Sequence, residues 1–277
     1  MAKFITKIRT ESGDLPVDYN ALGNLPILAS DNLLINGDFR NVVNQRRATS
    51  YSDNTSDDNW TYSVDRWRIK NANVTVNDKS IKVTATGSSG GTIQQAIGYY
   101  LPTDDYTASC SVKDIVGTAK FGVTGHVHNS TLVVGKNIAT WNDVEVGSLS
   151  ITLEANSSIE LEWIKLETGT IATPFVPRPY CEEIAMCQRY YKYVERTPIF
   201  ASNDTSLTYF MPVQFGIPMR ENPTKILRSV LSGNGTEQTD VTLDQCVSSI
   251  YNVTNIKLSK SIGQYGYVTI AFDAEYY

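Results

Sequence analysis

Apolar and polar residues alternate with a period of two through most of the region from residue 32 to about residue 175. The alternation is clearest in four runs, at Ile81–Ala85, Phe121–Val127, Ile151–Leu153 and Ile159–Trp163. Turn-forming Asn, Asp, Gly, Ser and Pro residues separate these runs. Because residues two apart on a strand share one face, the pattern predicts about eight short strands packed as a sandwich or jelly roll.

A second β pattern follows residue 197. Apolar residues recur at every other position, at Leu207, Tyr209, Met211, Val213 and Phe215, and the chain ends in another alternating strand, YGYVTIAFDAEYY. This predicts a second, smaller β-sandwich. A unit of about 80 residues buries little surface by itself. We therefore expect the second sandwich to pack against copies of itself.

Between the two β patterns, residues 178–196 are predicted to form a short helix. Pro179 suits the first helical position, and Glu182 and Glu183 in the first turn favour the positive end of the helix dipole. Pro198 would stop the helix. Its apolar positions step by four, three, four and three, at Tyr180, Ile184, Cys187, Tyr191 and Val194.

This two-heptad seam is too short for a helix that stands alone, because isolated helices below about 12–15 residues are marginal in water. The seam must therefore pack on another surface. One alternative is a bundle of identical helices from several chains. The other is packing onto the chain's own β region, which equally needs one apolar stripe. The pattern alone leaves both alternatives open.

The fold class is therefore mainly β with one short helix. The chain is predicted to have four consecutive parts. Residues 1–31 contain little apolar mass and fit a linker or attachment leader best. The jelly roll is predicted at 32–177, the helix at 178–196 and the smaller sandwich at 197–277.

Composition narrows the class of partner. The net charge of −5 argues against nucleic acid, since a basic patch supplies most of that affinity. No apolar run reaches the about 18 residues that a membrane span needs, and no apolar signal core follows Met1. The four cysteines lack the spacing of a zinc site or a disulfide framework. We expect reduced thiols and synthesis in the cytosol.

Three stretches carry a resemblance to a known family. They are DYNALGNLP at 18–26; NLLINGDFR at 32–40 with DRWRI at 65–69 and WIKLETGTIATPF at 163–175; and CEEIAMCQRYYKYVE at 181–195 with MPVQFGIPMRENPT at 211–224 and the terminal FDAEYY. In this order they resemble bacteriophage tail-fibre and receptor-binding proteins, and together they cover most of the chain.

The resemblance implies a virion protein of the phage tail, made in the cytoplasm of the host bacterium. It implies attachment to tail or baseplate proteins through the leader. It also implies a galactose-binding-like, carbohydrate-binding jelly roll and a C-terminal tip that is usually a homotrimer. The expected partner is a host cell-surface polysaccharide, bound without covalent chemistry. The rival functions are a polysaccharide depolymerase and a structural baseplate or collar component that binds no glycan.

Aromatic residues are the candidate sugar contacts, because an aromatic face packs on the apolar side of a pyranose while amides and carboxylates meet its hydroxyls. The candidates are Trp60 and Tyr62, beside Asp57, Asp58 and Asn59, together with Tyr99 and Tyr100 before a turn. Trp67, Trp141 and Trp163 are expected in the core. In the C-terminal part, Tyr251, Tyr265, Tyr267, Tyr276 and Tyr277 could form a second contact surface, or could be ordinary strand aromatics.

Metal and catalytic signals are weak, and we expect no enzyme and no cofactor beyond a calcium ion. Sugar-binding jelly rolls often hold a structural calcium near their first and last strands, and Asp38 and Glu167 match those places and offer oxygen ligands. The alternative is a pair of surface carboxylates. His126 and His128 share a strand face but have no third ligand nearby. Glu160 and Glu162 have about the spacing of a glycosidase carboxylate pair. Any strand with two acidic residues two positions apart has the same spacing, so this is weak evidence for an enzyme.

Overall fold

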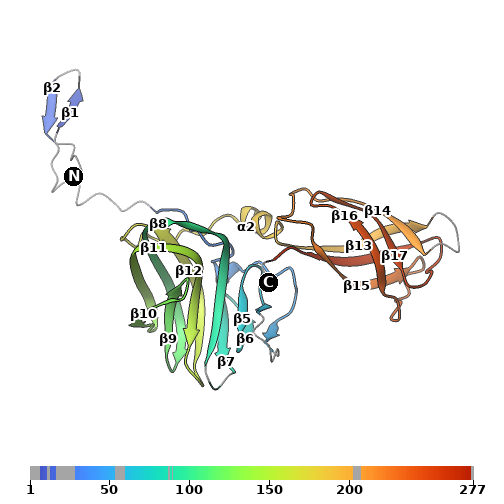
Figure 1. Cartoon of the computed structure of the whole chain (residues 1–277), viewed down its shortest axis with the longest axis horizontal. Coiled ribbons are helices and arrows are strands. Elements are labelled where there is room, and N and C mark those ends of the chain that lie inside the picture. The colour runs from blue at the N-terminus through green and yellow to red at the C-terminus, as the bar shows by residue number, and fades with distance from the viewer. Residues whose placement is uncertain are drawn as a thin grey trace.

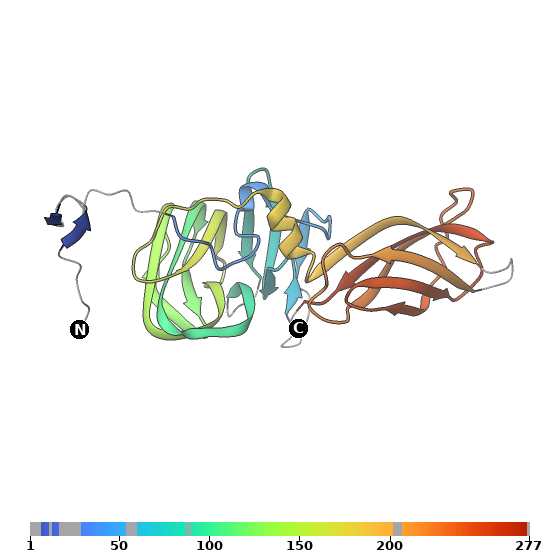
Figure 2. The ribbon, with the colours of Figure 1, turned by 90° about the horizontal axis from the view of Figure 1, so that it is seen from above.

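The computed structural model of the chain describes residues 7–10, 13–16, 29–53, 60–86, 88, 90–201 and 207–275. The described part is mainly β, as predicted, with a large antiparallel sheet, a short α-helix and a smaller six-stranded sheet. The two sheets lie end to end with the helix between them (Figures 1 and 2). Most of the predicted leader, including the stretch at 18–26, falls outside the described residues. In the described part of the leader, β1 (Lys7–Thr10) pairs antiparallel with β2 (Gly13–Pro16).

The large sheet has the strand order β10-β9-β11-β8-β12-β7-β6-β3, and β4 joins it through β5, which pairs with β8. Its strands are β3 (Ser50–Ser52), β4 (Thr61–Tyr62), β5 (Arg68–Lys70), β6 (Ala72–Asn77), β7 (Ser80–Ala85), β8 (Gly91–Val116), β9 (Ala119–Val123), β10 (His126–Thr131), β11 (Gly135–Leu153) and β12 (Ser158–Thr168).

The two longest strands, β8 and β11, fold the large sheet over its own core. The first residues of β8 pair with β5, whereas residues 106–116 pair with β12. A strand that changes neighbours in this way passes from one layer to the other, so the apolar faces of both layers meet. The alternating pattern supplies that core, in which Phe39 and Trp67 form an edge-to-face pair with ring centroids 5.4 Å apart.

The three tryptophans assigned to the core differ in burial. Trp67 and Trp141 are buried, as predicted. Trp163 is only half-buried, and its ring stacks on Phe175 with centroids 4.7 Å apart. That contact holds the segment after β12 against the outside of the large sheet.

The helix is shorter than predicted. Helix α2 spans Tyr180–Cys187, and strand β13 begins at Tyr191, so Tyr191 and Val194 lie on a strand. The prediction of a two-heptad seam is therefore wrong. Strand pairing with β18 gives these residues backbone hydrogen bonds from Tyr191 onward, which a marginal second heptad cannot match.

The chain itself covers much of the remaining stripe. Cys187 and Tyr191 are fully buried in the single chain, Ile184 is half-buried, and Tyr180 is exposed. The acidic side chain of Glu183 also faces inward, where it accepts a hydrogen bond from the backbone N–H of Asn36. The helix therefore packs on its own β region. None of the helices in the described part of the chain is long and apolar enough to cross a membrane.

The C-terminal sheet curls around a second apolar core into a near-barrel. Its strands are β13 (Tyr191–Ala201), β14 (Thr208–Gln214), β15 (Thr224–Ser232), β16 (Leu243–Ser248), β17 (Asn252–Leu258) and β18 (Tyr265–Asp273), in the order β15-β18-β13-β14-β17-β16. Its inner face is formed by alternate apolar residues, Tyr209 and Met211 among them, as the sequence pattern predicts.

A buried cluster of charges joins the two β parts. The guanidinium of Arg66 pairs with the carboxylate of Glu275, and the backbone N–H of Arg66 donates to the same carboxylate at 3.1 Å. Arg46 Nη1 lies 3.2 Å from Oδ1 of Asp65, in the turn between β4 and β5. Arg46 Nη2 lies 3.6 Å from Oδ2 of Asp273 and 3.7 Å from Oε1 of Glu275. Such pairs are costly to break once they are buried, so they fix the junction.

Aromatic rings close this cluster from the side of the C-terminal part. The guanidinium carbon of Arg66 lies 3.6 Å from the ring centre of Tyr190, and that of Arg46 lies 3.9 Å from the ring centre of Tyr191. These cation–π contacts exclude water from the charges. The two β parts therefore hold a fixed orientation in the chain.

Candidate ligand-binding site

A pocket opens where β8 and β11 bend together on the large sheet. Its volume is about 320 Å³, and the side chains that border it include those of Arg68, Gln94, Tyr100, Thr124 and Ser148. This volume lies at the lower end of the range for ligand pockets, which begins near roughly 300 Å³. The site therefore fits a small group, such as one ring of a longer molecule.

Irregular backbone creates the pocket. The pairing of β11 with β8 shifts register three times between Trp141 and Ser148, and Gly98 has a φ of +93°, which glycine adopts without strain. Bulges of this kind bend strands and commonly occur beside binding sites. The bend exposes residues of both strands that a regular sheet would pair.

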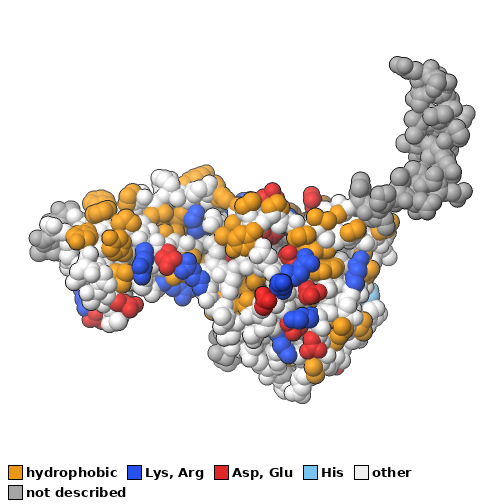
Figure 3. All heavy atoms as spheres, turned by 180° about the vertical axis from the view of Figure 1, so that it is seen from behind, with side chains coloured by type: hydrophobic (Ala, Val, Ile, Leu, Met, Phe, Trp, Pro, Cys, Tyr) orange, Lys and Arg blue, Asp and Glu red, His pale blue; other side chains and the backbone are white. Residues whose placement is uncertain are grey.

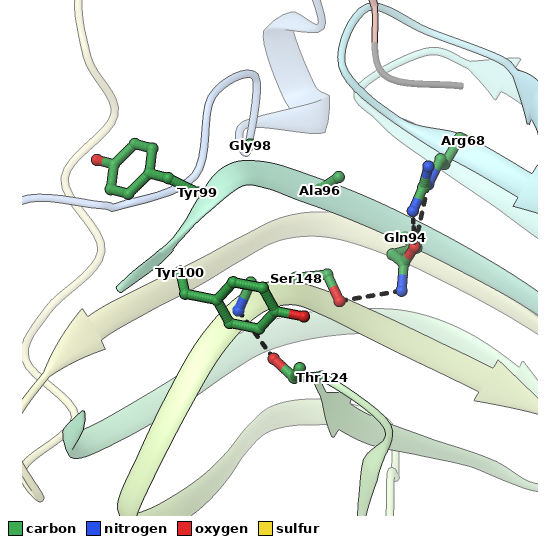
Figure 4. Close-up of a pocket in the computed structure, with 9 residues that line it drawn as sticks. Arg68, Gln94, Ala96, Gly98, Tyr99, Tyr100, Thr124 and Ser148 are labelled. Atoms are coloured by element: carbon green, nitrogen blue, oxygen red, sulfur yellow. Dashed lines mark hydrogen bonds between the residues drawn. The ribbon is translucent and has the colours of Figure 1, made fainter. Parts of the chain in front are cut away.

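A line of hydrogen bonds runs along one side of the pocket (Figure 4). Arg68 donates to the side-chain oxygen of Gln94 from Nε at 3.0 Å and from Nη2 at 2.6 Å. The amide nitrogen of Gln94 donates in turn to Ser148 Oγ at 3.1 Å. The line holds a cation, an amide and a hydroxyl in fixed positions at the pocket surface.

The indole ring of Trp60 packs against the guanidinium of Arg68. The guanidinium carbon lies 4.5 Å from the centre of the indole ring. Partial burial lowers the pKa of Arg68, yet an arginine keeps its charge throughout the physiological range. Trp60 is half-buried, so its predicted role changes from stacking on a ligand to holding the cation that borders the pocket.

The other side of the pocket is the ring of Tyr100. A Cβ atom on Gly147 would lie 3.1 Å from the Cε1 atom of this ring, so the missing side chain lets the ring rest on the backbone of β11. Thr124 fixes that backbone, because its hydroxyl accepts from the N–H of Gly147 at 2.8 Å. One face of Tyr100 is thus supported and the other is open, with the residue 64% exposed.

The two remaining aromatic candidates do not present a ring to this pocket. The ring of Tyr99 projects away from the Arg68–Gln94–Ser148 line, on the other side of β8 (Figure 4). Tyr62 is buried, and its ring lies 5.3 Å from the guanidinium carbon of Arg46 at the junction. Its assignment as a sugar contact is wrong because strand β4 turns that side chain into the protein. Asp57, Asp58 and Asn59 lie outside the described residues.

The sequence did not reveal Arg68, Gln94 or Ser148 as site residues. Arg68 follows the buried Trp67, so strand alternation alone would place it on the outer face. Its meeting with Gln94 depends on the pairing of β5 with β8, in which the two residues stand directly opposite. No local pattern gives that register.

The predicted calcium ligands are not brought together. Asp38 pairs in backbone register with Trp163, four residues before Glu167, so the backbone positions of Asp38 and Glu167 lie about 13 Å apart along the strand. Asp38 caps the 3₁₀ helix η1 (Phe39–Asn41) and forms an ion pair with Arg40 at 2.6 Å. The pair is therefore not a shared ligand set.

Glu167 has partners within the chain. Its carboxylate accepts from the N–H of Thr173 at 3.0 Å, pairs with Lys165 at 3.1 Å and also accepts from the hydroxyl of Ser30. Burial raises its pKa, but these hydrogen bonds outweigh burial and lower the pKa overall. Glu167 thus ties the chain after β12 to the sheet.

The other metal and catalytic candidates also have local partners. His128 packs edge-to-face on Trp141, and Glu160 pairs with Lys113 at 2.8 Å. Glu162 accepts from Ser111 at 2.7 Å. Among the described residues, no group of three or more His, Cys, Asp or Glu side chains could hold a metal ion.

Fold and site together define a mainly β protein with a small surface pocket between an aromatic ring and a polar line. No family model and no curated protein matches the chain. The solved structures that are similar to it include two of discoidin II from Dictyostelium discoideum. The recombinant form is 12% identical over 93% of this chain and 96% of that chain, with a TM-score of 0.25. The wild-type form is 11% identical over 92% and 94%, with a TM-score of 0.19. Only the site itself can therefore indicate a function.

Proposed function

We propose that the chain is a non-enzymatic glycan-binding protein whose pocket holds one sugar ring between Tyr100 and the Arg68–Gln94–Ser148 line. The supported, open face of Tyr100 beside that line carries the proposal. The ring offers the apolar surface on which the C–H face of a pyranose packs. The cation, amide and hydroxyl meet sugar hydroxyls from the side.

The finer proposal is that this protein is a phage tail-fibre or receptor-binding protein that adsorbs to a host cell-surface polysaccharide. The support is the resemblance of the three ordered sequence stretches. A pocket of about 320 Å³ binds one sugar weakly, so firm adsorption needs several copies. Holding several sites together raises the overall affinity by a factor of roughly 10²–10⁴.

A homotrimer would supply those copies, with its chains in contact through surfaces other than the predicted two-heptad seam. Light scattering on the purified chain tests this part of the proposal. A mass about three times the 30.7 kDa of one chain is expected. A mass of one chain would remove the trimer and leave the single-site proposal in place.

The binding proposal is tested by a glycan array with the full chain and two matched variants. Tyr100→Ala and Tyr99→Ala remove neighbouring tyrosines that are exposed to 64% and 67%. Tyr100→Ala should weaken retention about tenfold, in keeping with about 1–1.5 kcal/mol for a lost aromatic contact. Tyr99→Ala should retain the glycan. Equal behaviour of the two variants, or no retention of any glycan by the unaltered chain, would refute the proposal.

The rival depolymerase function needs two converging carboxylates near the bound sugar. The pocket lining, drawn from the described residues, contains no Asp or Glu, which favours binding over cleavage. Incubation of the chain with the polysaccharide that it retains, followed by size-exclusion chromatography, separates the two. Unchanged polymer length is expected, and shortening would establish the enzyme.

A further inference from the structure

A second cavity lies at one end of the C-terminal sheet, where the loop after β15 meets the start of β18. Its volume is about 390 Å³, and it is lined mainly by Ser232, Gly233, Asn234, Gly263, Gln264 and Tyr265. Apolar side chains also gather at the end of this sheet that faces away from the junction (Figure 3). The cavity is separate from the pocket on the large sheet.

The central feature of this cavity is an exposed tyrosine resting on a glycine. Tyr265 is 51% exposed, and a Cβ atom on Gly233 would lie 2.5 Å from its ring. The same arrangement holds Tyr100 on Gly147, where the corresponding distance is 3.1 Å. In both places the backbone supports one ring face, and the other face is open to a ligand.

Polar groups flank the ring here as they do at the first pocket. The side-chain oxygen of Asn234 accepts from Ser232 Oγ at 2.5 Å and from the N–H of Thr236 at 3.1 Å. These two bonds fix the amide of Asn234 beside the cavity. The side chain of Gln264 is exposed at the cavity edge. The cavity lining includes no charged residue, in contrast to Arg68 at the first pocket.

An aromatic row extends the cavity across the sheet. Phe200 stands opposite Tyr265 in the pairing of β13 with β18, and opposite Phe210 in the pairing of β13 with β14. Phe200 and Phe210 are 52% and 53% exposed. Residues directly opposite on neighbouring strands share a face, with Cβ atoms about 4.5–5.5 Å apart. The row therefore offers a continuous apolar track that begins at Tyr265.

We propose that this cavity and row form a second sugar-binding site, which takes a neutral oligosaccharide. One sugar ring packs on Tyr265 and is held by the amides of Asn234 and Gln264. The next units lie along Phe200 and Phe210. The site is neutral, whereas Arg68 gives the first pocket a positive charge, so the two sites differ in the sugars that they select.

The proposal does not depend on the first pocket. Glycan binding that survives Tyr100→Ala and is lost when Tyr265→Ala is added belongs to the second site. The test therefore uses the full chain carrying Tyr100→Ala, so that the first pocket is weakened in every sample. The probes are neutral oligosaccharides of glucose, galactose, mannose and N-acetylglucosamine, immobilised on an array, with sialylated oligosaccharides as the acidic comparison.

In that background, adding Tyr265→Ala should reduce retention on the neutral probes about tenfold. Gly233→Ala should reduce it as well, because the new methyl group displaces the ring. Tyr251→Ala, which removes a 58% exposed tyrosine outside the cavity, is the matched control and should change nothing.

Three results would overturn the proposal. The first is neutral-sugar retention by Tyr265→Ala equal to that of the Tyr251→Ala control. The second is no neutral-sugar retention in the Tyr100→Ala background at all. The third is a fall in the mass measured by light scattering when Phe200 is changed to Ser. That fall would make the row a contact between copies of the chain. Circular dichroism on each variant confirms that the sheet remains folded.

Discussion

The junction between the two β parts should weaken as the pH rises, and Asp65 should be the cause. Burial raises the pKa of Asp65 from 3.8 to about 7, against the opposing effect of the nearby Arg46. The folded protein therefore binds this proton more tightly than the unfolded chain does. The stabilisation from Asp65 is complete below about pH 4 and is lost as the pH rises through about 7.

The magnitude follows from the two pKa values. The difference between 3.8 and about 7, multiplied by 1.36 kcal/mol for each pH unit, gives about 4 kcal/mol. This is an upper value, because relaxation of the buried cluster around an ionised carboxylate reduces the cost of its charge. A typical domain has about 5–15 kcal/mol of stability in total, so the change is large enough to measure.

The assay is urea unfolding between pH 4.5 and pH 8, on the unaltered chain and on Asp65→Asn. Tryptophan fluorescence reports on the large sheet, since all four tryptophans of the chain precede the helix. Asn cannot ionise, so the stability of Asp65→Asn relative to the unaltered chain should rise by about 3 kcal/mol across this range, because about 1 kcal/mol of the total is already lost at pH 4.5. Other titrating groups are common to both proteins and cancel in the difference.

Asp78→Asn is the matched control, because Asp78 is an exposed aspartate on the same β part. It should leave the difference from the unaltered chain constant with pH. A difference for Asp65→Asn that stays flat, or that falls as the pH rises, would refute the account of the buried cluster.

Three further predictions concern the junction, the core and the thiols. Glu275→Gln leaves the buried Arg66 without its carboxylate and should lower the free energy of unfolding by about 3–5 kcal/mol in urea. Trp67→Ala removes a buried ring and its 2.8 Å hydrogen bond to the carbonyl of Asn36, and should cost about 3–5 kcal/mol in the same assay. Cys181 is exposed and should react with a thiol reagent at pH 8 well before Cys187, which burial protects by raising its pKa; equal rates would contradict the buried position of Cys187.

Part of the fold could be predicted from local pattern. Alternating residues in β7 and β12 share a face on any strand, so the sequence identified them as core strands before their partners were known. The start of α2 was also local, since Pro179 and the acidic first turn act within a few residues. The end of the helix could not be predicted locally, because Tyr191 and Val194 fit a helical heptad as well as a strand.

The candidate site divides in the same way. The sequence offered Tyr99 and Tyr100 equally, as aromatics before a turn. The structure replaces that turn with the continuous strand β8 and places only the ring of Tyr100 on the pocket. Gln94 and Ser148 are ordinary polar residues that gain a role only where β8, β11 and β5 meet. In the sequence Tyr62 was as good a candidate as Trp60, yet strand β4 turns the side chain of Tyr62 into the protein.

The sequence by itself determined the mainly β class, the position of the one predicted helix and the aromatic candidates, because each depends on periods of two to four residues. The tertiary structure decided how far the helix runs, which tyrosine ring borders the pocket and where the charges are buried. The pairing of Arg66 with Glu275 spans 209 positions, and that of Arg68 with Gln94 spans 26. Such contacts depend on strand register and on the packing of whole sheets, which no short stretch of sequence specifies.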